Sequence, residues 1–392
     1  MKTTPYKLID ICNMQSGGTP RRGTAEYYNG EILWAKIGDI ENAENGFINT
    51  TEEKITPAGL SAIRNRLFPK NTVLLAMYGS VGKVAIAGCE LSTNQAILGL
   101  IPDEEKLDYR FLAYWLKFKK NALLNEARGV ALQNISKTIV AKQVILLPSL
   151  EDQMRTVSIL DQADALRRRR KEAAKLLDEY VQSVFMEMFG DPVTNPKGWK
   201  QMSGGDYSKQ ISVGVVIKPA SHYAERGVIA LRSLNVKKNY INLDKIVYFS
   251  ENAHKSVVAK STLRFRDIVI VRTGATGTAA VIPQELDGIN CIDLIIVRPN
   301  PDIVNPYYLS FLFNSDRVKA IVASKEVGGI QKHFNIGAIR KLPLPMPPLE
   351  IQNKFEDIYL DTEILKVKMQ TQNQEIENQF NTLMQQAFVG AL

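Results

Sequence analysis

Two stretches of the chain place apolar residues at alternating steps of four and three, the spacing that is typical of long paired helices. The first runs from Ser149 to Gly190, and the second follows Pro348 and continues to the end of the chain. A helix of about 38 residues rises ~1.5 Å per residue and is roughly 57 Å long, too long for the interior of a compact domain. We therefore expect the two helices to pair as an intramolecular antiparallel coiled coil. The residues predicted to form the helix-pairing stripe are Ile159, Leu166, Leu177, Tyr180, Val184, Ile358, Leu365, Met369, Ile376 and Leu383.

Capping chemistry predicts where the first helix begins and ends. Ser149 precedes Asp152 by three residues, a spacing that allows a capping box. Gly190 followed by Pro192 is typical of a helix end. The second helix carries polar stripe positions such as Thr362, which favour one register or partner at some cost in stability. The alternative to pairing is that each helix packs on its own domain as an ordinary long helix.

Short β-rich runs and single helices occupy the rest of the chain, which indicates mixed α/β domains. In the first of these we expect strands at Val73–Met77 and Val84–Ala87, a helix at Asp108–Ala127 and a last strand at Val140–Leu147. The turn-forming residues after Gly190 indicate a linker. The expected division is a domain at 1–148, a helix at 149–190, a linker at 191–200, a domain at 201–348 and a helix at 349–392.

The second half of the chain repeats the first at a spacing near 200 residues. The turn Gly79-Ser-Val-Gly82 matches Gly274-Ala-Thr-Gly277, 195 positions later, and Leu150-Glu-Asp-Gln153 matches Leu349-Glu-Ile-Gln352, 199 positions later. Solenoids repeat every ~20–50 residues, so this period indicates a duplicated unit of one domain and one helix. The fold class expected is α+β, with two similar mixed α/β domains and two paired helices related by a pseudo-twofold. A twofold protein suits a site with two halves.

The composition narrows the class of partner. The 392 residues include 49 basic and 41 acidic side chains, a net charge of +8, and 45% are hydrophobic. This balance excludes a disordered chain and favours an anionic partner, nucleic acid ahead of a membrane surface. The three cysteines and three histidines lie far apart, which predicts neither a disulfide framework nor a metal site. Without a signal peptide or an apolar run of ~18 residues, the protein is expected to be cytoplasmic.

Two motifs that resemble cofactor sites have the wrong spacing or composition. Gly79-Ser-Val-Gly82-Lys83 lacks the pattern of a nucleotide phosphate loop, and is expected to be a tight turn facing DNA phosphate or a plain hairpin turn. Asn305-Pro-Tyr-Tyr308 resembles the catalytic tetrad of adenine methyltransferases, but it lacks the second proline and no glycine-rich cofactor turn precedes it. Pro306 suits the first position of a helix instead. The residues do not predict an enzyme.

Several segments together resemble the specificity subunits of type I restriction–modification systems. They include Gly17-Gly-Thr-Pro-Arg21, Tyr27-Tyr-Asn-Gly30, Trp34-Ala-Lys-Ile-Gly-Asp39, Tyr78-Gly-Ser-Val-Gly-Lys83, Asn94-Gln95 and the Leu-Pro-Ser-Leu-Glu-Asp-Gln entry to the first helix. The resemblance covers the whole chain, including the repeat. The second half departs from it, because it offers Val213-Gly-Val-Val216 and His222-Tyr223 where the first half has its Gly-Gly-Thr-Pro and Tyr-Tyr-Asn-Gly segments.

The resemblance implies a non-catalytic DNA-reading subunit with two target-recognition domains. Each domain is expected to read one half of a bipartite DNA site, and the paired helices are expected to set the gap and dock two modification subunits. Those partners would bind S-adenosylmethionine and methylate adenine, and restriction (nuclease) subunits could join them; no cofactor is expected in this chain. The alternatives are a coiled-coil assembly protein without a sequence-specific DNA role, and a free-standing DNA methyltransferase.

The candidate DNA contacts are polar and basic residues of the predicted loops, since amides can pair with base edges and cations with phosphates. The run Arg167-Arg-Arg-Arg-Lys171 in the first helix is either a solvated face or a phosphate-facing run between the half-sites. The candidates are Thr19, Arg21, Arg22, Lys36, Ser80, Lys83, Asn94, Gln133 and Asn134 in the first half, and Arg232, Arg272, Thr273, Thr276, Gln331, Lys332 and His333 in the second.

Overall fold

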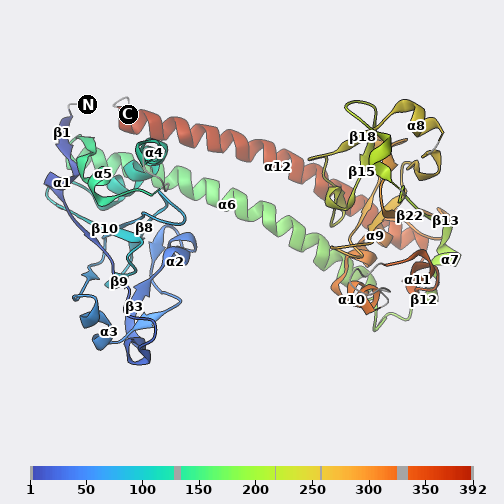
Figure 1. Ribbon diagram of the computed structural model, residues 1–392, viewed down its shortest axis with the longest axis horizontal. Helices are drawn as coiled ribbons and strands as arrows, with labels where there is room; N and C mark the ends of the chain where they lie inside the picture. Colours follow the sequence, from blue (N-terminus) through green and yellow to red (C-terminus); the bar gives the residue numbers. More distant parts are fainter. Residues whose placement is uncertain (1–2, 128–133, 217, 257, 325–333, 390–392) are drawn as a thin grey trace. The chain divides into compact units, whose positions relative to one another are not determined.

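The computed structural model divides the chain into two compact units (Figure 1). Unit 1 comprises Met1–Glu172 with Thr371–Leu392, and unit 2 comprises Ala173–Gln370. The division passes through both long helices, α6 (Leu150–Phe189) and α12 (Leu349–Val389), so each unit contains a segment of each helix. The residues described are 3–127, 134–216, 218–256, 258–324 and 334–389.

A five-stranded sheet forms the centre of unit 1, in the order β2-β10-β7-β8-β4. Helix α4 (Tyr109–Ala127) packs against it. Alternate residues of a strand point to opposite faces of a sheet, and accordingly Leu75 packs in the cluster that contains Phe111 of α4, whereas Leu74 packs with Ile40 on the other face. The strands are β2 (Cys12–Ser16), β4 (Phe47–Ile48), β7 (Val73–Ala76), β8 (Val84–Ala87) and β10 (Ile97–Pro102).

A smaller sheet, β5-β3-β9-β6, lies on the side of the larger sheet away from α4 (Figure 1). Its central strands β3 (Tyr28–Ala35) and β9 (Leu91–Thr93) are parallel, with Trp34 opposite Ser92 and Ala35 opposite Thr93. Parallel strands end at the same edge of a sheet. The outer strands are β5 (Lys54–Ile55) and β6 (Leu67–Phe68).

Unit 2 repeats this arrangement with different loops. Its larger sheet has the order β13-β22-β19-β20, and its smaller sheet the order β14-β18-β15-β21, in which β15 and β21 are again parallel. The strands are β13 (Ser208–Val213), β14 (Tyr223–Ala224), β15 (Val228–Leu231), β18 (Val247–Phe249), β19 (Ile268–Val271), β20 (Ala279–Val281), β21 (Asn290–Cys291) and β22 (Leu294–Pro299). The predicted internal repeat is therefore confirmed at the level of sheet topology.

The remaining elements connect these sheets to the long helices. In both units the first and last strands form a two-stranded antiparallel sheet directly before the long helix: β1 (Thr4–Lys7) with β11 (Val144–Leu147), and β12 (Lys200–Met202) with β23 (Leu344–Met346). A separate hairpin joins β16 (Val236–Lys237) to β17 (Tyr240–Ile241). The shorter α-helices are α1 (Leu8–Ile11), α2 (Ile37–Glu41), α3 (Pro57–Ala62), α5 (Lys137–Lys142), α7 (Gly204–Tyr207), α8 (Glu251–Lys255), α9 (Pro306–Asn314), α10 (Asp316–Ser324) and α11 (Ile336–Arg340).

Two predicted boundaries need correction. The expected strand Val140–Leu147 is a strand only from Val144, because Ser136 accepts a hydrogen bond from the Ile139 backbone and starts α5. The second-half counterpart of α4 is broken into α9 and α10, because Ser315 has extended backbone angles and ends the first helix. The start of α9 is as expected, since the Asn305 side chain caps it.

The capping chemistry of α6 is also as expected. The Ser149 hydroxyl accepts a hydrogen bond from the Asp152 backbone N–H (3.2 Å) and donates one to the Asp152 carboxylate (2.8 Å). Gly190 ends the helix with a φ of +76°, a conformation that glycine adopts without steric cost.

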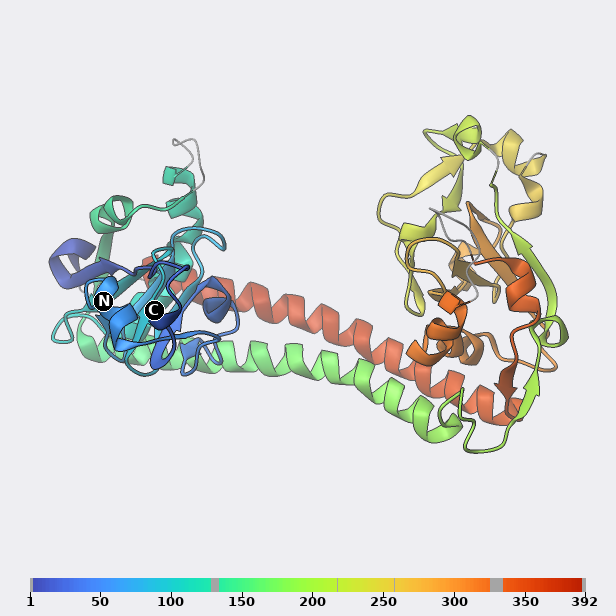
Figure 2. The same cartoon turned by 60° about the horizontal axis from the view of Figure 1, so that its bottom comes forward.

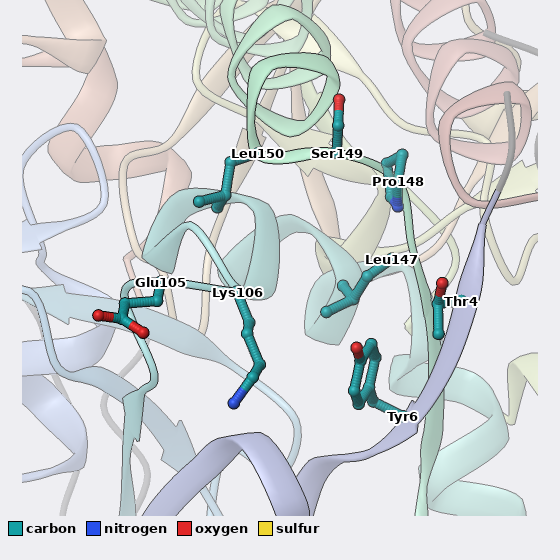
Figure 3. Close-up of a pocket in the computed structure, with 8 residues that line it drawn as sticks. All are labelled: Thr4, Tyr6, Glu105, Lys106, Leu147, Pro148, Ser149 and Leu150. Atoms are coloured by element: carbon teal, nitrogen blue, oxygen red, sulfur yellow. The ribbon is translucent and has the colours of Figure 1, made fainter.

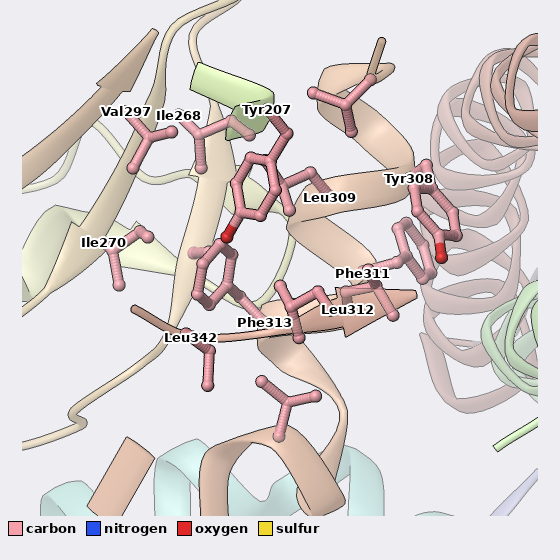
Figure 4. Packing of buried hydrophobic residues seen from close by; sticks show 14 of the residues in the cluster. Tyr207, Ile268, Ile270, Val297, Tyr308, Leu309, Phe311, Leu312, Phe313 and Leu342 are labelled. Carbon is pink, nitrogen blue, oxygen red and sulfur yellow. The ribbon is translucent and has the colours of Figure 1, made fainter. Parts of the chain in front are cut away.

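The long helices pack on the α/β domain of each unit through aromatic residues. In unit 2, Phe185 of α6 stacks on Tyr308 and Phe311 of α9, with ring centroids 5.7 and 5.6 Å apart, and meets Phe355 of α12 at 5.2 Å. Figure 4 shows this core, in which Phe313 lies near Ile270 of β19, whereas Tyr308 and Phe311 lie on the side of α9 that faces the long helices. In unit 1, Phe111 of α4 packs on Phe388 of α12 at 5.1 Å.

The two long helices run side by side and antiparallel (Figures 1 and 2). In unit 1 the early part of α6 meets the late part of α12, with Leu160 packed against Phe380 and Met384. In unit 2 the late part of α6 meets the early part of α12, where Phe189 packs on Phe355. The predicted pairing of the helices is confirmed.

The predicted stripe is partly wrong. Ile159, Leu166, Tyr180 and Leu365 are 36%, 50%, 51% and 46% exposed. A straight helix turns every 3.6 residues, so a strict four-three stripe drifts around it, and the facing positions include charged residues that a search for apolar residues passes over. Of the other stripe residues, Met369 is buried, whereas Leu177, Val184, Ile358, Ile376 and Leu383 are half-buried.

Candidate nucleic-acid interface

Loops from both sheets of unit 1 converge where the parallel strands β3 and β9 end. Lys36 follows β3 directly, and Asn94 follows β9, with the Asn94 backbone N–H donating to the Ala35 carbonyl (2.9 Å). The Asn94 side chain accepts a hydrogen bond from the Ala96 backbone (3.1 Å), which shapes the turn into β10. Lys36 and Asn94, which the sequence predicted separately, thus lie at one edge.

The β7–β8 hairpin turn joins the same edge. Met77, at its start, donates its backbone N–H to the Ala96 carbonyl (2.8 Å), and Gly79 and Gly82 both have φ near +75°, at +70° and +79°. Side chains at these two positions would be strained. Glu41 at the end of α2 accepts hydrogen bonds from Ser80 and from Lys83 (2.7 Å). The glycines therefore build a hairpin turn and hold Ser80 and Lys83 at the surface.

An ion-pair network lies beside Lys36. Glu53 accepts from Arg22 (2.7 Å) and from Lys36 (2.7 Å), and the Arg22 guanidinium lies over the rings of Tyr28 and Trp34, 5.0 and 5.1 Å from their centroids. Hydrogen bonds from Arg22 and Lys36 hold the pKa of Glu53 below its usual 4.5. The Arg22 side chain is 56% exposed, whereas those of Lys36 and Glu53 are 22% and 30% exposed, so water partly screens the network and it contributes modestly to stability.

A shallow groove of about 450 Å³ opens next to this network and contains residues that the sequence analysis missed. Thr19 and Gln95, both exposed, hydrogen-bond to each other across it. Arg66 donates to the Gly17 carbonyl (2.5 Å), and Arg64 lines the same groove. Arg64 and Asn65 both have positive φ, at +62° and +52°, a turn that non-glycine residues rarely adopt and that the sequence does not indicate.

In unit 2 the equivalent edge carries Arg232, which follows β15 as Lys36 follows β3. Both residues begin a short helix whose third residue, Asn235 or Asp39, accepts a hydrogen bond from their backbone N–H. Arg232 also donates to the Lys245 carbonyl. The two units therefore hold a basic residue at the same place in their smaller sheets.

The side chain of Arg272 is held inside the protein and is not exposed as a surface contact would be. It occupies the position of the buried Met77 in unit 1, since the Phe334 N–H bonds to its carbonyl (3.2 Å) as the Ile135 N–H bonds to that of Met77 (3.2 Å). Its guanidinium pairs with Asp293 (2.7 Å) and is only 16% exposed. We therefore interpret Arg272 as a residue that supports the surrounding loops, and no longer as a direct DNA contact.

Some of the remaining predicted DNA contacts lie within the described residues and others lie outside them. Arg21 is exposed, Asn134 and Thr273 are half-buried, and Thr276 donates to the Arg272 carbonyl (3.4 Å). Gln133, Gln331, Lys332 and His333 lie outside the described residues.

The arginine run of α6 is mostly engaged within the protein. Arg167 pairs with Glu377 (3.0 Å) and Asp164 (2.6 Å). Arg168 pairs with Asp164 (3.3 Å) and donates to Asn45 (2.7 Å), and Arg170 reaches Gln372 (3.3 Å). Arg169 and Lys171 are exposed, and no ion pair or hydrogen bond of their side chains occurs within the described ranges. The idea that the whole run faces phosphate is thus narrowed to these two residues.

Other sites give no sign of chemistry. Among the described residues no group of His, Cys, Asp and Glu could hold a metal ion, and no described helix is long and apolar enough to cross a membrane. Burial raises the pKa of the Cys12 thiol to about 12 and also raises that of Cys291.

A cavity of about 310 Å³ lies where β1 and β11 meet the start of α6, lined by Tyr6, Lys106 and Ser149 among others (Figure 3).

The chain matches the family described as Type I restriction modification DNA specificity domain over residues 2–176 and 215–378. These segments cover most of the sequence, and both units contribute to them. The protein belongs to this family.

Individual relatives agree with this assignment. The chain is 24% identical over 372 residues to the type I restriction enzyme MjaIX specificity subunit of Methanocaldococcus jannaschii, which covers 90% of this chain and 84% of that protein. It is 18% identical over 330 residues to the EcoBI specificity subunit of Escherichia coli, covering 76% and 69%.

Two solved structures share the fold. A chain from a study of complex assembly and conformational transition of the type I R-M system has a TM-score of 0.65 at 18% identity, covering 100% of this chain and 98% of that one. The type I restriction–modification S subunit from M. genitalium has a TM-score of 0.55 at 14% identity, covering 99% and 96%.

Proposed function

We propose that the protein is the sequence-specific DNA-recognition subunit of a type I restriction–modification complex and acts in the cytoplasm. Each unit reads one half of a bipartite site, and the chain itself catalyses no reaction. The observation that carries this proposal is the repeated edge: both units place loops with a basic residue, Lys36 or Arg232, at the ends of the parallel strands of the smaller sheet. Phosphate contacts position such a surface, and amide and arginine side chains in its loops can read bases.

The contact surface proposed in unit 1 is the convergent edge and the groove beside it. Lys36, Lys83 and Arg22 supply positive charge for phosphates, while Gln95 and Thr19 present hydrogen-bonding groups that fit base edges. In unit 2, Arg232 and the loop of Thr273 and Thr276 occupy the corresponding place, and the undescribed segment with Gln331, Lys332 and His333 remains part of the proposal. Because the loops differ between the units, the two half-sites are expected to differ.

Modification subunits are the proposed partners of the exposed apolar residues on the long helices. Leu176 and Tyr180 on α6, and Ile364 on α12, are 52%, 51% and 55% exposed, more apolar surface than a helix in water ordinarily leaves uncovered. These partners, two per chain, would bind S-adenosylmethionine and methylate adenine, and restriction subunits would bind through them.

The first experiment is to express the chain with its modification subunit in a host that lacks adenine methylation and to map the modified adenines. A split motif with a fixed gap is the expected result. If no adenine is modified while the same modification subunit is active with another specificity chain, the DNA-reading proposal fails and a scaffold role becomes the better one. A titration of the isolated chain with S-adenosylmethionine, expected to show no binding, tests the free-standing methyltransferase.

The second experiment tests the docking surface. Because Tyr180 and Ile364 both lie in unit 2, Tyr180→Asp with Ile364→Asp should lower the number of modification subunits that co-purify with each chain from two to one, since two charges would enter an apolar contact. Gln374→Asp, at an exposed polar position of α12, is the matched control and should co-purify normally. Equal co-purification of both variants would place the docking surface elsewhere.

A further inference from the structure

Two ion clusters between α6 and α12 repeat each other. In unit 1, Arg167 of α6 lies between Asp164 on its own helix and Glu377 on α12. In unit 2, Lys366 of α12 lies between Glu363 on its own helix (2.6 Å) and Asp178 on α6 (2.5 Å). We call these the Arg167 triad and the Lys366 triad. Each has two carboxylates around one central cation, and in unit 1 Arg168 also pairs with Asp164.

The members of the two triads are related by the internal repeat. Arg167 and Lys366 are 199 positions apart, as are Asp164 and Glu363, and Asp178 and Glu377. The same interval separates Gln153 from Gln352 at the starts of the helices. In both triads the cation therefore comes from the helix that follows its own recognition domain, and one acid comes from the other helix.

Both triads give the same antiparallel register. The residue numbers of the interhelical pairs, Arg167 with Glu377 and Lys366 with Asp178, add to 544 in each unit. The apolar packing between these pairs is sparse: of residues 167–178 of α6 and residues 366–377 of α12, Met369 alone is buried. Apolar side chains packed into holes normally fix the register of paired helices, and here one buried methionine is all that this stretch supplies.

A slip of one heptad would disrupt both triads. Shifted one way, Lys366 would face Lys171 and Arg167 would face Gln370; shifted the other way, the two cations would face Phe185 and Met384. The first arrangement sets two positive charges against each other, and the second places charges against the apolar contacts of the helix ends. Polar groups at paired helices are best attested in this role of fixing register at little gain in stability.

These ion clusters contribute little to the strength with which α6 and α12 bind each other. Asp178 and Glu377 are 73% and 42% exposed, and the Lys366 triad lines a cavity of about 940 Å³. Ion pairs so open to water contribute little to the free energy of unfolding. They instead make the native register lower in free energy than the neighbouring registers, in which the ion pairs are broken, and so they specify the register.

We infer that Arg167 and Lys366 are positioning residues that fix the register of α6 against α12 and thereby the length of the unread gap in the DNA site. The inference rests on the proposed function, in which the helices set that gap. It predicts that breaking the triads relaxes the choice of gap, whereas a residue that only stabilises the fold would lower methylation of all sites alike.

The test uses the full chain assembled with its modification subunit, and duplexes that carry the mapped half-sites with the native gap or with one to three base pairs more or less, because a one-heptad slip of ~10.5 Å spans about three base pairs. The measured quantity is the ratio of methylation rates on native and altered gaps. Arg167→Glu combined with Lys366→Glu should lower this ratio by about tenfold, equivalent to about 1.4 kcal/mol. Adding Glu377→Arg and Asp178→Lys should restore it, since the interhelical pairs are re-formed with reversed sign.

Lys354→Glu is the matched control, because Lys354 pairs with Glu350 within α12 (2.8 Å) at the surface; it should leave the ratio unchanged. A ratio that stays constant in the charge-reversed variant, or that the compensating changes fail to restore, overturns the inference. Both results leave DNA reading by the wild-type complex intact, so they are distinct from failure of the proposed function.

A second measurement does not depend on DNA. Cysteines at Ala174 and Gln370, whose numbers also add to 544, should form a disulfide in the native register. The yield should fall in the charge-reversed variant and recover in the compensated one. Equal yields in all three would show that the triads do not set the register, whatever the methylation assay finds.

Discussion

One buried glutamine closes the junction between domain and helix in each unit. Gln153 accepts a hydrogen bond from the Asp108 backbone N–H (2.9 Å) and donates to the carbonyls of Lys106 (2.8 Å) and Pro148 (3.1 Å). Gln352 repeats this with the Asn305 N–H and two carbonyls. These contacts explain the glutamine of the repeated Leu-Glu-x-Gln motif, which the sequence showed without indicating its role.

Gln153→Leu and Gln352→Leu should each lower the free energy of unfolding by about 1–3 kcal/mol, because buried backbone groups lose their partners. Urea unfolding of the assembled protein, followed by circular dichroism, measures the change. Gln162→Leu, at an exposed position of α6, is the control and should have little effect. Loss of the same size in all three variants would show that the junction hydrogen bonds are not the cause.

The pKa of Glu53 reports the integrity of the proposed contact surface. Hydrogen bonds from Arg22 and then Lys36 lower it below 4.5, so this pairing stabilises the fold above pH 4.5 and is lost as the pH falls through the lower folded-state pKa. Arg22→Gln should raise the titration midpoint of Glu53 towards 4.5, measured from its carboxyl carbon resonance. Glu41, which Lys83 and Ser80 hold low, should not respond; a parallel shift of both would indicate a general change of structure.

At the scale of elements, the arginine run of α6 separates into residues with different roles. Arg167 also lies over the Phe380 ring, 4.5 Å from its centroid, so Arg167→Gln should lower the thermal stability of the helix pair. Arg169→Gln should instead reduce the slope of log affinity against log salt by about 0.9 if one phosphate contact is lost. Filter binding of the complex to its site at several salt concentrations measures the slope. An unchanged slope would remove the run from the DNA interface.

The elements show which parts of the structure a sequence can predict. The two long helices, the cap at Ser149, the glycine turns and the repeat all depend on local chemistry or on self-similarity, and each was predicted. The helix-pairing residues were predicted less well, because Arg167 and Lys366 occupy facing positions through ion pairs with Glu377 and Asp178, which lie far away in the chain.

The proposed site shows the same limit. Loop chemistry predicted Lys36 and Asn94 as contacts, and the structure places both at one edge, whereas the ion pair of Arg272 with the distant Asp293 was not predicted. The groove residues Arg64 and Arg66 owe their position to a turn that packs against Gly17 and Gly18, and nothing nearby in sequence marks them. Contacts between segments far apart in the chain are what local patterns omit.

At the scale of the whole molecule, one scaffold carries two different reading surfaces. Gly17 and Gly214 occupy the same place, each donating its N–H to the first residue of the next strand, Ile97 or Leu294. A side chain at either glycine would meet backbone atoms of the neighbouring strand, at Thr93 or Cys291. Beyond these glycines the loops of the two units differ in sequence and length, so the same sheets support different surfaces.

We expect each recognition domain to be exchangeable. Gln153 hydrogen-bonds to backbone atoms of residues 106, 108 and 148, which another family member's domain can supply, provided that the chimera keeps side chains that contact the long helices, such as Phe111 on Phe388. The exchanged protein should methylate a motif that is changed in one half, with the other half and the gap retained. Exchange of residues 201–348 should change the opposite half. Methylome sequencing of both chimeras decides this: if either exchange alters both halves or the gap, the two units do not read independently, and a register fixed by the triads would not be enough to set the site.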